Sequence, residues 1–295
     1  FKQKTAYEIP LRLVGSEMCI RDSYIDIDIP KSGLYKNQIL MLDILSKNDW
    51  KRPIYFTGGS YKDSEYLWMK DFLQLDGLVY KLVPIKTPIN QDNPYQMGRI
   101  EPYRMYDIVK KWEWGNSESS EIYHDPETRK NSISFRGNLH RLAESFVSIG
   151  ENVKAKEIMD LSFEKMPLEY FEYYSLSEPY ISTYHKIGEK DKAQKLYSDI
   201  EKKYLDQIKY YSNSLENYPD FFSISDYAEN IFTYTERYRG LIENEIFEGN
   251  YIFASKSIEN FLNYTQSFKT IYGEYDYYSF LLNFVEPLYI SEKSK

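Results

Sequence analysis

The sequence contains almost no cysteine or histidine and no long apolar run. Its 295 residues include one Cys and three His, which excludes a disulfide framework and a zinc site built on thiolates. His124, His140 and His185 lack the second His four residues away that a helical zinc site uses. No stretch of about 18 or more apolar residues occurs, so these residues predict no transmembrane helix. We expect no metal and no cofactor.

The balance of charge is acidic. Lys and Arg number 37, Asp and Glu number 45, and the formal net charge is -8 at pH 7. Nucleic acids need clustered Lys and Arg to neutralise their phosphates, whereas the lysines here are interspersed with acids. We therefore expect no nucleic-acid partner. We attribute the 31 Tyr to AT-rich coding DNA rather than to a carbohydrate-binding surface.

The first residues need separate treatment. Residues 2–9 (KQKTAYEI) and 13–22 (LVGSEMCIRD) resemble the in-frame translation of a sequencing-library adaptor, with a variable index between them. We interpret residues 1–23 as such an artefact and exclude them from the fold prediction. Cys19 falls inside this stretch. The unit that follows would then be truncated at its beginning.

Residues 24–115 predict a small α/β unit. Alternation over residues 24–30 predicts a strand, and the apolar spacing over residues 35–47 predicts a short helix. The β-prone runs 53–57 and 78–83 predict two more strands. Between them we expect a helix over residues 61–75.

Residues 122–295 predict an all-α array, which makes the fold class α+β. A Ser-rich break at residues 115–121 marks the boundary, and Asp125 followed by Pro126 is a helix start signal. Residues 149–155 (IGENVKA) recur as 187–193 (IGEKDKA), and residues 248–254 (EGNYIFA) keep the same spacing from Gly to Ala. A glycine can end one helix in the left-handed conformation, and a small alanine lets the next helix approach closely.

This repetition resembles tetratricopeptide repeats, whose units are roughly 34 residues long. Phe146 and Tyr184 match the aromatic before the turn, Ala143 the small residue, and Pro167 the closing proline. The second unit departs from the pattern, with Ile181 and Leu205 at those last two positions. A last helix over residues 275–289 would cap the stack.

The repeats offer one candidate binding surface, the concave groove on which such arrays usually bind peptides. By the register of the family, the groove positions are His140, Glu144, Glu178, Ser182, His185 and Arg239. The partner would be a protein or peptide. A bland solvated face is the alternative interpretation.

Other signals for chemistry are weak. Asp26 and Asp28 share one strand face but lack a third polar group. Residues 58–60 (GGS) follow a strand, yet a phosphate loop needs a Lys and more glycines, so a turn fits better. Trp112 and Trp114 would present two indoles on one face if extended, as sugar-binding platforms do, or would pack at the domain junction. No catalytic residues are predicted.

Several stretches resemble one known family. They are residues 48–56 (NDWKRPIYF), 73–84 (LQLDGLVYKLVP), 105–107 with 114–116, and 135–138 with 142–144. Together they resemble the C-terminal region of bacterial protein O-mannosyltransferase-like membrane glycosyltransferases, over about residues 24–211.

The resemblance implies a parent enzyme that transfers a sugar from a lipid-linked donor to exported proteins, with its catalytic acids in a membrane domain not present here. This chain would be its non-catalytic C-terminal module at the extracytoplasmic, periplasmic face of the bacterial inner membrane, binding or positioning the acceptor protein. It would touch the membrane only through the missing domain. The alternatives are a free-standing tetratricopeptide adaptor and a carbohydrate-binding domain that uses Trp112 and Trp114.

Overall fold

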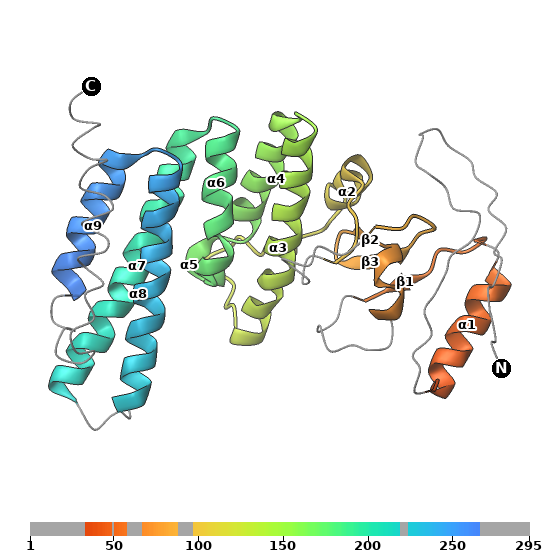
Figure 1. The fold of residues 1–295 in the computed structure, drawn as a ribbon, viewed down its shortest axis with the longest axis horizontal. Coiled ribbons are helices and arrows are strands. Elements are labelled where there is room, and N and C mark those ends of the chain that lie inside the picture. The colour runs from red at the N-terminus through yellow and green to blue at the C-terminus, as the bar shows by residue number, and fades with distance from the viewer. Residues whose placement is uncertain (1–32, 49, 58–66, 88–96, 219–223, 266–295) are drawn as a thin grey trace. The chain divides into compact units, whose positions relative to one another are not determined.

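The computed structural model describes residues 33–48, 50–57, 67–87, 97–218 and 224–265. They are mostly helical and include one small sheet (Figure 1). The chain divides into two compact units. The first consists of the residues up to Ile122 together with Gly137–Glu151, and the second consists of Tyr123–Arg136 together with the residues from Asn152 onward. The strand predicted at 24–30, the turn at 58–60 and the helix at 275–289 lie outside the described residues.

The first unit is built on a three-stranded antiparallel sheet. Its first described element is α1 (Lys36–Asn48), close to the helix predicted at 35–47. The strands are β1 (Tyr55–Phe56), β2 (Leu73–Asp76) and β3 (Val79–Leu82), in the order β1-β3-β2. The apolar runs 53–57 and 78–83 therefore do contain strands, as predicted.

The helix predicted at residues 61–75 is confirmed in part where the structure describes it: residues 67–72 are helical, but residues 73–75 form a strand. A 3-10 helix, η1 (Leu67–Phe72), leads directly into β2, which pairs with β3 in the register Asp76 to Val79. Gly77 occupies the turn with a φ of +77°, which fits a two-residue hairpin with glycine at its first central position. The Asp-Gly pair at 76–77 is a strong hairpin signal.

The two faces of the sheet differ in polarity. Leu73 and Leu82 lie on one face and belong to a buried cluster with Leu45, Met69, Phe72 and Met97. On the opposite face the buried Asp76 accepts hydrogen bonds from Gln74 (2.9 Å) and from Arg104 (3.0 Å). Arg104 belongs to α2 (Pro102–Val109), so this ion pair fastens α2 to the sheet.

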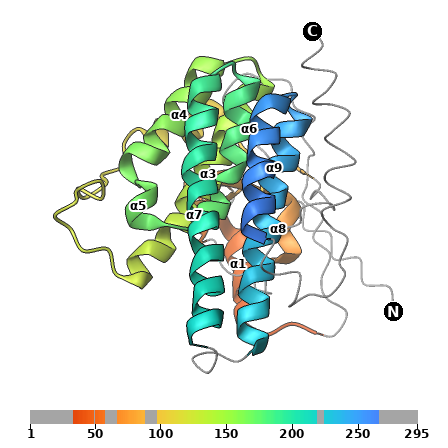
Figure 2. The same ribbon diagram turned by 90° about the vertical axis from the view of Figure 1, so that its left-hand side faces the viewer.

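The second unit is a succession of helices that starts with the first part of α3 (Pro126–Ser148), a helix whose residues from Gly137 onward belong to the first unit. The start signal is confirmed, because α3 begins where the Asp125 carboxylate accepts from the backbone N–H groups of Glu127 and Thr128. The helices that follow are α4 (Asn152–Lys165), α5 (Leu168–Phe171), α6 (Glu178–Lys186), α7 (Lys190–Asn217), α8 (Ile224–Phe247) and α9 (Tyr251–Thr265), with a short 3-10 helix η2 (Tyr174–Leu176) after α5. α7 packs against both α6 and α8, and α9 packs against α8 and α7 (Figures 1 and 2).

Three of these helices end in the same way. Gly150, Gly188 and Gly249 have φ values of +80°, +83° and +80°. At each end the glycine N–H bonds the carbonyl three residues back and the next N–H bonds the carbonyl five back, which is the Schellman arrangement. The alanines five residues on, Ala155, Ala193 and Ala254, are completely buried. The geometry predicted from the repetition is therefore present at all three turns.

Buried tyrosines connect neighbouring helices. The Tyr184 hydroxyl on α6 donates to Asp160 on α4 at 2.9 Å. Tyr204 on α7 donates to Glu178 on α6, and Tyr238 on α8 donates to Glu201 on α7. Burial, followed by the nearby carboxylate, raises the pKa of each tyrosine, so each remains a protonated donor. Part of the high tyrosine content thus has a structural role.

We predict that Gly188→Ala lowers the free energy of unfolding by about 1 kcal/mol, because a Cβ disfavours the left-handed conformation. A Cβ at Gly188 would meet nothing within 4 Å, so steric crowding does not contribute. The matched control is Gly240→Ala within α8, where added space is equally free and the substitution should raise stability by roughly 0.5–1 kcal/mol. Urea unfolding followed by circular dichroism measures the free energy of unfolding of both variants. Equal changes of the same sign would contradict the left-handed helix end at Gly188.

Candidate functional site

A groove in the second unit runs along one side of α7. It has a volume of about 740 Å³, which falls within the roughly 300–1,000 Å³ of typical ligand sites. Its α7 side is a stripe of residues at helical spacing: Lys192, Lys195, Leu196, Asp199, Lys202, Lys203 and Asp206. At 1.5 Å per residue, this stripe is about 21 Å long.

The groove has an apolar floor and a second wall from the segment that follows α4. Phe163, Leu168 and Leu196 line it together with the ring of Tyr174. Figure 2 shows α5, which contributes Leu168, to one side of α7 and below α4. Apolar floors with a few polar groups at the edge are characteristic of binding sites rather than of solvated helix faces.

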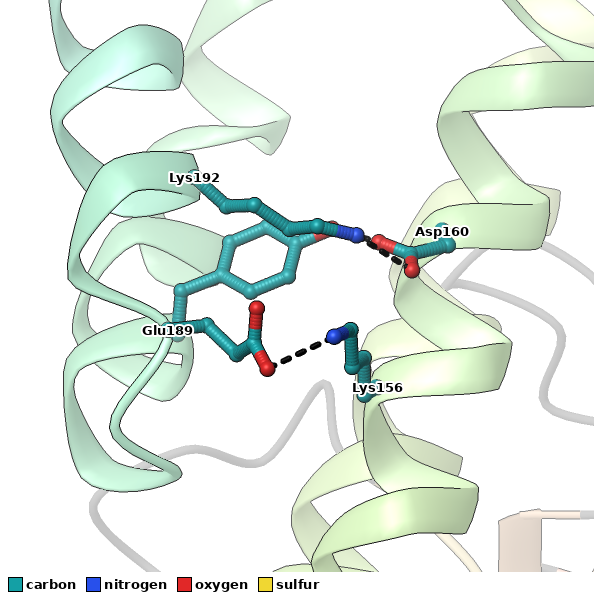
Figure 3. Close-up of polar contacts among 5 residues, drawn as sticks. Lys156, Asp160, Glu189 and Lys192 are labelled. Atoms are coloured by element: carbon teal, nitrogen blue, oxygen red, sulfur yellow. Dashed lines mark hydrogen bonds and ion pairs between the residues drawn. The ribbon is translucent and has the colours of Figure 1, made fainter.

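Two ion pairs join α4 to the start of α7, where Lys192 lines the groove (Figure 3). Lys192 on α7 pairs with Asp160 on α4 at 2.5 Å, and Lys156 on α4 pairs with Glu189 at 2.7 Å. Asp160 also accepts from the Tyr184 hydroxyl, and the Lys192 ammonium lies 5.9 Å from the centroid of the Tyr184 ring. These contacts fix the separation of α4 and α7 where the groove begins.

The remaining charges of the stripe are not used by the fold. Lys195, Asp199, Lys202, Lys203 and Asp206 alternate in sign at spacings of three and four residues, at which opposite charges on a helix can pair. Within the part of the chain that the structure describes, none of the five forms an ion pair. Lys203 instead lies over the Tyr174 ring, 5.5 Å from its centroid. These charges are free to contact a ligand.

The wall opposite α7 contains strained backbone. Glu172 (φ +57°, ψ -134°) and Tyr173 (φ +48°, ψ +49°) are consecutive non-glycine residues with positive φ. Such conformations cost roughly 1–3 kcal/mol each and concentrate at ligand clamps and other functional positions. An ion pair from Arg129 to Glu172 (3.1 Å) and a contact between His124 and Phe171 (4.6 Å between centroids) help to hold the segment.

Behind the floor lies a completely buried arginine. The Arg136 guanidinium is 4.9 Å from the centroid of the Phe163 ring and donates to the Met166 carbonyl at 2.6 Å. This carbonyl lies just past the end of α4, where the helix dipole carries partial negative charge. The Tyr180 hydroxyl donates to the Arg136 carbonyl at 2.7 Å. Phe163 is thereby held in place from behind.

The α6 residues that are predicted to face a concave groove make contacts with other helices. Glu178 accepts from Tyr204, and Ser182 donates to Glu248 at 2.8 Å. The His185 ring, only 5% exposed, lies 3.3 Å from the fully buried carboxylate of Glu245. These three side chains are therefore committed to packing between helices, and a ligand role for them stays a prediction.

The other predicted groove residues form contacts along their own helices. His140 and Glu144 lie one turn apart on α3, with 3.7 Å between imidazole and carboxylate. Arg239 on α8 pairs with Glu236 (2.7 Å) and Glu243 (2.5 Å). His140 and Glu144 belong to the first unit, and Arg239 to the second.

The two tryptophans proposed for sugar stacking lie close together after α2. The Trp112 and Trp114 rings are 5.5 Å apart between centroids and meet edge to face at 66°, so they do not form a coplanar platform. The Trp112 ring also lies 2.8 Å from where a Cβ on Gly77 would be. Trp112 therefore packs against the hairpin turn of the sheet.

The α7 groove was not predicted from the sequence. The signal is present, because the stripe from Lys192 to Asp206 recurs with the period of a helix, but a charged stripe normally indicates a solvated face. What makes it a groove is the wall formed by α5 and η2. That wall depends on the backbone at Glu172 and Tyr173, which no residue pattern indicates.

The described residues show neither a metal site nor a membrane span. Within these ranges, no group of three or more His, Cys, Asp or Glu could hold a metal ion. None of the helices among them is both long and apolar enough to cross a bilayer.

One comparison with known proteins gives a match. Residues 13–103 match the family model described as TMEM260-associated domain 2, which is consistent with a TMEM260-like domain in this part of the chain. The match contains the motifs at residues 48–56 and 73–84. It begins inside residues 1–23, so the adaptor interpretation stays a prediction. No curated protein and no solved structure matches the chain.

We predict that Tyr204→Phe lowers the free energy of unfolding by roughly 1–3 kcal/mol, because Glu178 keeps its charge but loses its donor. Burial is the first cause that raises the pKa of Glu178, and the Tyr204 hydroxyl opposes it. A carboxyl whose pKa is raised in the folded state lowers the free energy of unfolding as the pH rises above the pKa of about 4.3 that it has in the unfolded chain. The loss in Tyr204→Phe should therefore be larger at neutral pH than at pH 4.

The control for this prediction is Glu178→Gln, which removes the charge and keeps an acceptor for the tyrosine hydroxyl. It should increase stability at neutral pH, with the gain disappearing as the pH falls through about 4.3. Urea titrations at both pH values measure both variants. A Tyr204→Phe effect independent of pH would show that the carboxylate is not involved.

Proposed function

We propose that this chain is a non-catalytic, extracytoplasmic module of a membrane-bound protein O-glycosyltransferase, and that it holds acceptor protein as an extended peptide in the α7 groove. The observation that carries the proposal is the groove itself: an open channel with an apolar floor, edged by charged side chains that the fold leaves unpaired. Peptide ligands offer both apolar side chains and charges to such a surface.

The link to a membrane protein rests on the first unit. The match of residues 13–103 to TMEM260-associated domain 2 supports a module associated with a membrane protein. The resemblance of residues 48–56 and 73–84 to membrane O-glycosyltransferases supports the enzyme class. If this assignment is right, the natural gene encodes a series of hydrophobic segments upstream of this module, and a complete gene without them would contradict it.

The local geometry supports binding rather than catalysis at the groove. The carboxylate of Asp160, next to the groove residues Lys192 and Tyr184, is neutralised by the first and hydrogen-bonded by the second. Asp199 and Asp206 are free carboxylates, but no described His, Ser or Cys lines the groove beside them to complete an acid–base or nucleophilic constellation.

One alternative, a free-standing adaptor, would use the same groove. The other, a carbohydrate-binding domain, gains no specific support from Trp112 and Trp114, because their rings meet edge to face.

We predict that the full chain binds arrayed Ser- and Thr-rich peptides, and that Lys195→Trp combined with Lys202→Trp abolishes the binding. Both lysines are exposed and line the groove, so the indoles should fill the channel without disturbing the core. The expected loss is at least about tenfold in Kd, the scale of a contact worth 1.4 kcal/mol. Fluorescence anisotropy with the strongest array peptides measures it.

The matched control is Gln194→Trp combined with Ser198→Trp. These residues are exposed on the same helix but do not line the groove, so binding should stay unchanged. Equal binding by the wild type and the groove variant, or no binding by the wild type, would show that the groove does not hold peptides.

A further inference from the structure

We infer that the α7 groove selects extended peptides in which charged and apolar residues alternate, in the pattern acidic, apolar, basic, apolar, acidic. This inference rests on the proposed function and adds the chemistry of the partner. It follows from the order of the charges along α7 and from the apolar floor beside them.

The spacing of the groove charges matches an extended peptide. Lys195, Asp199 and Lys203 lie four residues apart on α7, which places them about 6 Å apart along the helix axis. In an extended chain, side chains on the same face recur every second residue, at about 6.6–6.8 Å. Over three positions the two repeats differ by about 1.2–1.6 Å, and each step of four residues turns about 40° around the helix; flexible Lys and Asp side chains can absorb both.

The order of the charged residues along α7 determines which charges a bound peptide should carry, and in which order. An acidic residue opposite Lys195, a basic one opposite Asp199 and an acidic one opposite Lys203 would form three favourable pairs. Lys202 lies beside Lys203 and also lines the groove without an ion-pair partner among the described residues. The third position therefore attracts an acid most strongly.

The apolar floor selects the residues between the charges. In an extended peptide, successive side chains point to opposite faces. When the charged residues face α7, the intervening ones turn away from it, toward the apolar side chains Phe163, Pro167 and Leu168. Apolar side chains at these positions would be removed from water, as the hydrophobic effect favours.

The pattern does not depend on the direction of the peptide. Acidic, apolar, basic, apolar, acidic reads the same from either end, so both orientations satisfy the three groove charges. A uniformly acidic ligand is disfavoured, because Asp199 and Asp206 on α7, and Glu169 on the opposite wall, would face like charges. The groove therefore discriminates by charge order and not by net charge alone.

The test compares two fluorescein-labelled peptides of identical composition, with centres Asp-Leu-Lys-Leu-Asp and Asp-Leu-Asp-Leu-Lys, in the same Ser-Thr-Gly flanks. Anisotropy with the full chain should give the alternating peptide a Kd about fivefold lower, because the second peptide forms one favourable and two unfavourable pairs in either orientation. The preference should weaken at high salt, since exposed charges are screened.

The variant Asp199→Lys makes the three charges opposite the peptide, at positions 195, 199 and 203, all positive. The two peptides should then bind equally, and a peptide with the centre Asp-Leu-Asp-Leu-Asp should bind most tightly. Asp191→Lys is the control, because it makes the same change of charge at an exposed position of α7 outside the groove. It should leave the preference for the alternating peptide intact.

The outcomes separate the two proposals. Equal binding of the first two peptides by the wild type, lost in the Lys195→Trp and Lys202→Trp variant, would overturn the alternating pattern and leave the groove as a peptide site. Binding that survives that variant, or no binding of any peptide, would overturn both.

Discussion

The helical unit depends on hydrogen bonds between a tyrosine hydroxyl on one helix and a carboxylate on an earlier one. Tyr184 reaches back to Asp160, Tyr204 to Glu178, and Tyr238 to Glu201. Each ring is buried and fills space as a hydrophobic side chain would, while its hydroxyl fixes the position of the helix along its neighbour. A buried donor or acceptor without its partner costs roughly 1–3 kcal/mol, so sliding one helix by a turn would break a specific bond. The bonds thus help to set the register of α4, α6, α7 and α8.

That register determines where the groove lies. Asp160 on α4 receives Tyr184 from α6 and Lys192 from α7, so one carboxylate joins three helices. α7 is held again by Tyr204, which reaches Glu178 on α6. Between these anchors its stripe of lysines and aspartates faces the wall made by α5 and η2. The groove is therefore preorganised by contacts that do not themselves use its free charges, and preorganisation reduces the cost of binding.

Local signals in the sequence predicted much of the fold and little of the site. The three glycine turns were predictable because Gly150, Gly188 and Gly249 each need only their own φ value and two local hydrogen bonds. The start of α3 was predictable for the same reason. The strand β2 was missed because the helix predicted over residues 61–75 covered it, although Leu73 and Leu75 have the two-residue spacing of a strand and Asp76 and Gly77 formed a hairpin signal. The groove was missed because its far wall arises from strained backbone at Glu172 and Tyr173, where the residue types give no indication.

The unpaired charges of α7 are the feature that distinguishes the groove from an ordinary helix surface. Exposed ion pairs four residues apart stabilise a helix by only about 0.3–0.5 kcal/mol, so their formation or absence hardly affects folding. For the same reason a ligand can recruit these side chains at almost no loss of stability. The carboxylates of the half-buried Glu178 and the buried Glu245 are different, because each is already held within the fold, the first by Tyr204 and the second beside His185. In this unit the carboxylates between helices fix the positions of the helices along one another. The unpaired charges of α7, which lie beside the apolar floor of the groove, remain available to bind a ligand.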